Sequence, residues 1–147
     1  MAVKIEINFE KDPLFEDFLQ TGIKNYNNLH SPYHLKSREE GYVKTINIIV
    51  RNPADEIVGG INGTVYWNWA KIEDLYFEAP YRKLGLGHKI LEDFIVQARA
   101  SGANKVFLTT YSFQAKAFYE KHGFFVVGLL EDYPPGENYY TMVKKLS

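Results

Sequence analysis

The amino-acid sequence predicts a mixed α+β domain, and three observations support this. Some segments alternate apolar and polar residues with period two, or are short apolar runs bounded by turns, as strands are. Other segments place apolar residues three and four positions apart, as amphipathic helices do. In the second half, a strand, a helix and a strand follow one another in the order of a right-handed parallel crossover. The 147 residues are most simply one domain, residues 1–147, large enough to bury a core.

The first forty residues begin with a predicted strand over 4–9 (KIEINF), where apolar and polar residues alternate. A helix should follow, because Asp12 can cap it and Pro13 suits its first position. Gly22 is the expected end of this helix. Residues 25–41 are polar and irregular, and we expect a long loop there, a kind of segment that often carries function.

Three antiparallel strands are predicted next, over residues 42–50, 57–67 and 69–77. The segment RNPADE supplies turn residues between the first two strands, and a second turn falls near Trp67 and Asn68. Short turns join neighbouring antiparallel strands, so these segments predict a three-stranded meander.

The second half continues with a helix whose apolar side chains share one face: Leu86, Ile90, Phe94, Ile95 and Ala98. After it we expect a strand over 106–111, a helix from its cap Ser112 to its stop Gly123, and strands over 124–130 and 139–146. The resulting order of elements is β-α-loop-βββ-α-β-α-ββ.

Composition excludes several classes of protein. The formal net charge of −1 gives no electrostatic footprint for nucleic acid or for an anionic membrane surface. The absence of cysteine excludes a disulfide scaffold, a thiolate zinc site and a cysteine nucleophile in this chain. The N-terminus does not have the pattern of a signal peptide, and no apolar run is long enough to span a membrane. A cytoplasmic location is therefore expected.

Two glycines stand where a helix is about to begin, in the stretch YRKLGLGHKI over residues 81–90. Unpaired N–H groups at a helix start can bind an anion, and glycine lets a phosphate approach the backbone closely. Arg82 could add a charge-assisted contact. The alternative is a tight turn between a strand and a closely packed helix. The stretch lacks the Gly-Lys-Ser/Thr of a nucleotide P-loop and the spacing of a dinucleotide fingerprint.

The pattern R-x-x-G-x-G after a strand, followed by AKAFYEKHGF over 115–124, resembles the GNAT superfamily of N-acetyltransferases. The resemblance covers most of the chain; it is strongest over residues 72–124 and weak over the first forty. It implies a mixed, mostly antiparallel sheet with parallel central strands splayed apart and helices on both faces. It also implies acetyl-CoA as co-substrate, with its diphosphate bound by the glycine loop.

Carried over residue by residue, the resemblance implies a set of cofactor-binding positions on the strand, the loop, the helix start and the second motif. They are Leu75, Tyr76, Phe77, Arg82, Lys83, Leu84, Gly85, Leu86, Gly87, His88, Ser112 and Tyr119. The sequence departs from many members at Lys83, where glycine is common, and at Ser112, where asparagine is common.

The resemblance implies direct attack of an amine on the acetyl thioester in a ternary complex. Tyr119 is the expected general acid, although it could also be a core aromatic. Glu73 is the first candidate for the general base and Asp74 the second, because alternate residues of a strand face opposite sides. An acidic residue on a strand can also simply face solvent.

The acceptor is expected to be a small-molecule amine or a peptide amine, with Tyr26, His30, Trp67 and Tyr133 as candidate wall residues. We expect no metal site, no nucleic-acid or membrane partner, and a possible homodimer. Two rivals are an acyl-CoA-binding sensor of the same fold without activity, and a homodimeric interaction protein whose glycine loop is only a turn.

Overall fold

The computed structural model describes residues 1–146, and the chain forms two compact units, residues 1–39 and residues 40–147. The first unit contains helices α1 (Pro13–His30) and α2 (Pro32–Ser37). The predicted start of α1 is confirmed, because Oδ1 of Asp12 accepts the Phe15 N–H at 3.0 Å. Ser31 separates the two helices in an extended conformation, and its Oγ accepts the His34 N–H at 3.2 Å.

Three predictions for the first unit are wrong. Residues 4–9 do not form a strand: no other strand among the described residues pairs with them, and an isolated strand leaves its backbone groups without partners. The helix does not end at Gly22 but continues to His30, because one glycine costs an 18-residue helix only about 1 kcal/mol. The loop predicted over 25–41 is largely helical. The missed signal is Ser31 followed by Pro32, the same cap-and-proline pair that marks the start of α1.

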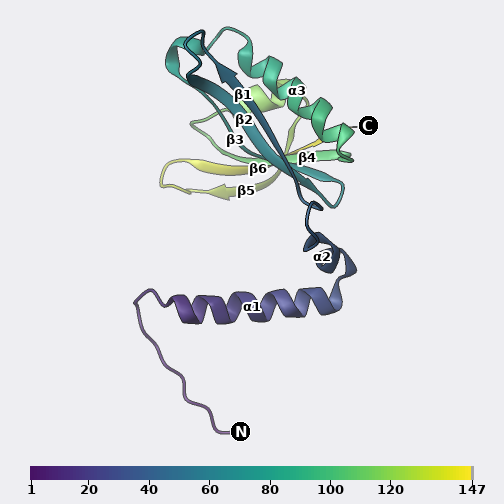
Figure 1. The fold of residues 1–147 in the computed structure, drawn as a ribbon. Helices are drawn as coiled ribbons and strands as arrows, with labels where there is room; N and C mark the ends of the chain where they lie inside the picture. The colour runs from purple at the N-terminus through teal and green to yellow at the C-terminus, as the bar shows by residue number, and fades with distance from the viewer. Residues whose placement is uncertain (147) are drawn as a thin grey trace. The chain divides into compact units, whose positions relative to one another are not determined.

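The second unit is a six-stranded mixed sheet with the strand order β1-β2-β3-β4-β6-β5 (Figure 1). Its strands are β1 (Lys44–Arg51), β2 (Ile57–Tyr66), β3 (Trp69–Phe77), β4 (Lys105–Tyr111), β5 (Phe125–Glu131) and β6 (Asn138–Lys145). All neighbouring pairs are antiparallel except β3 and β4. The predicted α+β fold, the meander and the parallel crossover are confirmed.

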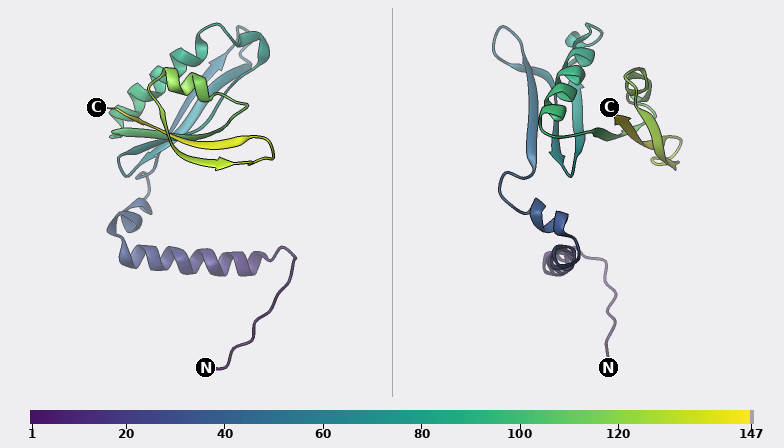
Figure 2. Two further views of the ribbon diagram at one scale, coloured as in Figure 1. Left: turned by 180° about the vertical axis from the view of Figure 1, so that it is seen from behind. Right: turned by 90° about the vertical axis from the view of Figure 1, so that its right-hand side faces the viewer.

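The parallel pair at the centre of the sheet is short. β3 and β4 pair only from Trp69 opposite Lys105 to Lys71 opposite Phe107. Beyond these residues the strands no longer pair, and the two halves of the sheet diverge (Figure 2). The last six residues of β3 therefore have a neighbouring strand on one side only, which exposes a backbone edge inside the sheet.

Helices α3 (Leu86–Ala100) and α4 (Lys116–Lys121) contribute to one hydrophobic core. The predicted face of α3 is confirmed at Ile90, Phe94 and Ala98, and the core also takes Leu91, which the pattern did not single out. The prediction that Ser112 caps the following helix is wrong. α4 begins at Lys116, and Ser112 instead accepts the Asn138 N–H at 2.9 Å. Within residues 1–146, no helix is both long enough and apolar enough to cross a bilayer.

Candidate functional site

The loop between β3 and α3 contains two residues with left-handed backbone. Gly85 precedes the first residue of α3 with a φ of 78°, and Lys83 has a φ of 61°. Glycine adopts this conformation freely, whereas a residue with a Cβ is strained by about 1 kcal/mol or more. The left-handed backbone conformation is by itself a sufficient reason for glycine at position 85. It also shows that Lys83 occupies a position that suits glycine.

An open space lies over the start of α3. A Cβ added to Gly85 would meet no atom within 4 Å, and one added to Gly87 would meet only the Phe118 ring, at an ordinary 3.6 Å. No side chain caps the N-terminus of α3, so its first N–H groups remain available to a ligand. Nothing in the free chain therefore requires glycine at 87, whereas a diphosphate against the backbone would. The residues fit the phosphate groups of coenzyme A.

Arg82 is anchored beside this space. Its Nε donates a hydrogen bond of 2.8 Å to the carbonyl oxygen of Phe77, and its guanidinium lies 5.5 Å from the centre of the Tyr76 ring. The terminal guanidinium nitrogens have no hydrogen-bond partner among the described residues. Arg82 thus offers two free terminal NH2 groups near the end of β3, the donor geometry that binds a phosphate in a bidentate manner.

The start of α3 is tied to α4 by a histidine pair. Nδ1 of His88 lies 2.6 Å from Nε2 of His122, and Nδ1 of His122 lies 2.8 Å from the carbonyl oxygen of Phe118. Nε2 of His88 also lies 3.2 Å from Oε1 of Glu92. These contacts join the start of α3 to the helix that carries Tyr119.

Tyr119 is buried between Phe118 and Phe124, with 6% of its surface exposed. Burial raises the pKa of its hydroxyl to about 12, and the negative charge of Asp74 adds to this effect. The hydroxyl therefore keeps its proton throughout the neutral range. It has no hydrogen-bond partner among the described residues and can donate to a bound ligand.

The raised pKa predicts an alkaline loss of stability. Between the unfolded pKa of 10.0 and the folded value of about 12, the native state holds a proton that the unfolded state has released. Stability therefore falls as pH rises through this window, by about 2–3 kcal/mol. Urea unfolding at pH 9, 10, 11 and 12 should show a smaller loss for Tyr119→Phe than for the parent chain. Parallel curves for the two proteins would contradict the prediction.

Glu73 and Asp74 lie at an irregularity of β3. Asn62 is opposite Asp74 but Gly63 is opposite Ile72, so β3 has one additional residue, Glu73, at this point. Such a bulge interrupts the strict alternation of side chains. Both side chains are exposed, so burial does not distinguish the two candidates, and the choice between Glu73 and Asp74 stays a prediction.

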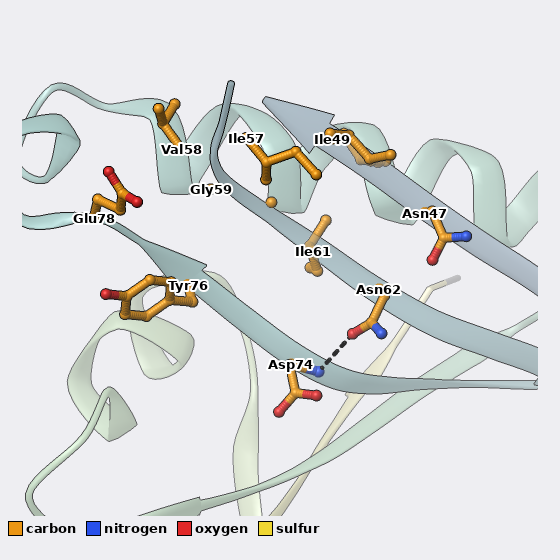
Figure 3. Close-up of a pocket in the computed structure, with 12 residues that line it drawn as sticks. Asn47, Ile49, Ile57, Val58, Gly59, Ile61, Asn62, Asp74, Tyr76 and Glu78 are labelled. Atoms are coloured by element: carbon orange, nitrogen blue, oxygen red, sulfur yellow. Dashed lines mark hydrogen bonds between the residues drawn. The ribbon is translucent and has the colours of Figure 1, made fainter. Parts of the chain in front are cut away.

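The two carboxylates have different surroundings. Oε1 of Glu73 lies 3.4 Å from Nζ of Lys71 in an ion pair. Asp74 has no ion pair or side-chain hydrogen bond among residues 1–146, and it lines a pocket of about 360 Å³ on β1, β2 and β3 (Figure 3). Asp74 is also the charged residue that acts on Tyr119. Of the two carboxylates, that of Asp74 is therefore the one without a charged partner among the described residues.

The remaining predicted cofactor residues lie along the same elements. Leu75, Tyr76 and Phe77 pair with β2 on one side and have no strand on the other, so this edge can pair with an extended ligand. The Leu84 side chain is exposed, and Leu86 packs partly against the core. Ser112 has other partners: its Oγ donates to the Glu137 carboxylate and accepts the Asn138 N–H. Its part in cofactor binding stays a prediction.

The predicted acceptor residues are not gathered in one place within the second unit. Trp67, in the turn before β3, lines an apolar pocket of about 370 Å³ with Trp69 and Phe107. The Tyr133 ring lies 6.4 Å from that of Tyr111, the last residue of β4. Trp67 and Tyr133 therefore lie toward opposite ends of β4. In the first unit, the Tyr26 and His30 rings on α1 are 4.2 Å apart.

Sequence reasoning missed the polar residues that surround Asp74. Asn47 is opposite Asn62 across β1 and β2, and Asn62 is opposite Asp74 across β2 and β3. The three residues form a polar row on adjacent strands. A signal for them was present, because Asn47 interrupts the apolar run over residues 46–50 and Asn62 follows Ile61 within a predicted strand. Among the described residues, no group of three or more His, Cys, Asp or Glu side chains could hold a metal ion.

Comparison with known proteins gives a consistent result. Residues 10–124 match the family described as the acetyltransferase (GNAT) family. Blasticidin-S acetyltransferase of Streptomyces morookaense is 34% identical over 62% of this chain and 68% of its own. The crystal structure of an acetyltransferase from Bacillus cereus has a TM-score of 0.79 at 24% identity, covering 96% of this chain and 98% of that one. A Bacillus anthracis acetyltransferase solved with acetyl coenzyme A has a TM-score of 0.60 at 25% identity, covering 70% and 63%.

Proposed function

Because the chain belongs to the acetyltransferase (GNAT) family of acyltransferases, we propose that it transfers an acetyl group from acetyl-CoA to a primary amine. The attack is direct, in a ternary complex, and the acceptor is a small-molecule amine. The observation that carries this proposal is the open cradle at Gly85 and Gly87, on a helix joined to the one that carries Tyr119. The relative named for blasticidin-S supports a small acceptor.

The co-substrate supplies the acetyl thioester that the amine attacks. The backbone N–H groups at the start of α3 and the free nitrogens of Arg82 bind its diphosphate. The unpaired edge of β3 at residues 75–77 binds the extended arm by strand addition. Each of these groups belongs to the free chain and is already in place, so little ordering is needed on binding.

Two side chains handle protons in this proposal. The Tyr119 Oη holds its proton at neutral pH and donates a hydrogen bond where negative charge develops. An alkylammonium has a pKa near 10.4, so freeing its lone pair at neutral pH costs about 4–5 kcal/mol. Glu73 and Asp74 remain the candidate proton acceptors, and the absence of an ion pair favours Asp74. The variants Glu73→Gln and Asp74→Asn, measured separately, distinguish the two candidates, because only loss of the true proton acceptor should lower the rate of transfer.

The alternative function is an acyl-CoA sensor that binds but does not transfer. The free hydroxyl of Tyr119 and the free carboxylate of Asp74 favour catalysis, because a sensor requires neither. A peptide amine remains the second acceptor class.

A panel of amines incubated with acetyl-CoA tests the proposal, with thiol release and product mass as readouts. We expect transfer to at least one class among polyamines, amine-bearing antibiotics and short peptides, together with acetyl-CoA binding by calorimetry. Binding without transfer to any amine would support the sensor. Failure to bind would contradict the assignment of the cradle.

A further inference from the structure

Asn62 has a role that the reaction by itself does not reveal. We propose that Asn62 is a positioning residue, whose side chain holds the bulge of β3 at Glu73 and so directs the Asp74 carboxylate. The proposal rests on the function proposed above and assigns the proton acceptor to Asp74. Asn62 itself need not touch either substrate.

The hydrogen bonding of the bulge carries this inference. Between Asn62 opposite Asp74 and Gly63 opposite Ile72, the ladder of β2 and β3 is interrupted by one residue. The Asp74 N–H donates to Oδ1 of Asn62 at 3.0 Å, as Figure 3 shows. The side chain of Asn62 therefore supplies the acceptor at the position where the register is broken. In Asn62→Ala the side chain has no oxygen that could accept this hydrogen bond.

The orientation of the Asp74 side chain matters because Asp74 lies beside a pocket and acts on Tyr119. Asp74 lines the pocket on β1, β2 and β3, beside Tyr76 and Glu78. It also acts electrostatically on the buried Tyr119 hydroxyl. A carboxylate on a residue that lines the pocket and also acts on Tyr119 is suited to take a proton from an ammonium group bound beside it. In that step one N–H bond breaks, one O–H bond forms on Asp74, and the electron pair stays on the nitrogen.

Asn47 provides a matched control. It is the same residue type, it lines the same pocket, and it is opposite Asn62 on the neighbouring strand. It makes no hydrogen bond to Asp74 among the described residues. Any general effect of replacing a polar pocket residue with alanine should appear equally at Asn47.

Two measurements test the proposal. In the free chain, amide hydrogen exchange at Asp74 should accelerate at least about tenfold in Asn62→Ala, return toward the parent rate in Asn62→Asp, and stay unchanged in Asn47→Ala. In acetyl transfer, Asp74→Asn should lower kcat/KM for the amine about a hundredfold and Asn62→Ala about tenfold. Asn62→Ala added to Asp74→Asn should cost no more than about a further twofold, because both changes act through one carboxylate.

Several results would overturn the proposal: unchanged Asp74 exchange in Asn62→Ala, equal losses in Asn47→Ala and Asn62→Ala, or a full tenfold further loss in the Asp74→Asn background. Intact transfer by Asp74→Asn would also overturn it, because Asn62 would then have no base to position. Failure of the proposed function is distinguishable from these outcomes. A chain that acetylates no amine contradicts the function, while exchange in the free chain still reports whether Asn62 holds the bulge.

Discussion

Replacing Tyr119 with phenylalanine is expected to lower kcat by between about tenfold and a thousandfold while acetyl-CoA binding survives. The ring stays in its core position between Phe118 and Phe124, so packing changes little. The lost group is one hydroxyl that is protonated at neutral pH and has no partner among the described residues. Steady-state kinetics with a saturating amine, together with calorimetry for acetyl-CoA, measure the two effects separately.

Tyr140→Phe is the matched control for this experiment. Tyr140 is also partly buried against the core, but its hydroxyl already accepts a hydrogen bond of 3.4 Å from Nδ2 of Asn138. The Tyr140→Phe variant is expected to keep kcat within about twofold of the parent value. Equal turnover in Tyr119→Phe and the parent chain would remove the hydroxyl from the mechanism and leave Tyr119 as a packing residue.

Replacing Gly87 with alanine is expected to separate stability from function. The added methyl meets only the Phe118 ring at 3.6 Å, so the free chain accepts it. Alanine is the better helix former, and the free energy of unfolding should be unchanged or rise by up to about 1 kcal/mol. A diphosphate against the helix start would meet the same methyl. The Kd for acetyl-CoA should therefore rise about tenfold to a hundredfold, or about 1.4–2.8 kcal/mol.

Gly22→Ala is the matched control, because Gly22 also lies inside a helix and a Cβ there meets nothing within 4 Å. It should change acetyl-CoA affinity by less than about twofold and also not lower stability. Chemical denaturation and calorimetry measure both quantities on each variant. A Gly87→Ala variant that binds acetyl-CoA like the parent chain would show that the loop is only a turn.

Local chemistry made much of the second unit predictable. The strands of the meander, the apolar face of α3 and the glycine loop each depend on neighbours close in the chain, such as turn residues, helical spacing and Gly85. The left-handed turn at Gly85 that leads into α3 was predictable for the same reason, since a helix start and its preceding loop form one local structure.

The first unit was less predictable because its patterns were ambiguous. Residues 4–9 alternate as a strand does, but a strand exists only where another strand satisfies its backbone. The polarity of residues 25–41 concealed the continuation of α1, which depends on one tolerated glycine and on the cap at Ser31.

By itself, the sequence determined the strand–helix order of the second unit, the glycine loop and the tyrosine that follows it. Only the tertiary structure decided which acidic side chain of β3 is free, because that depends on a bulge, an ion pair to Lys71 and a hydrogen bond from a different strand. The burial that raises the pKa of Tyr119 was decided in the same way. Each depends on residues distant in the chain, and one-dimensional periodicity carries no information about them.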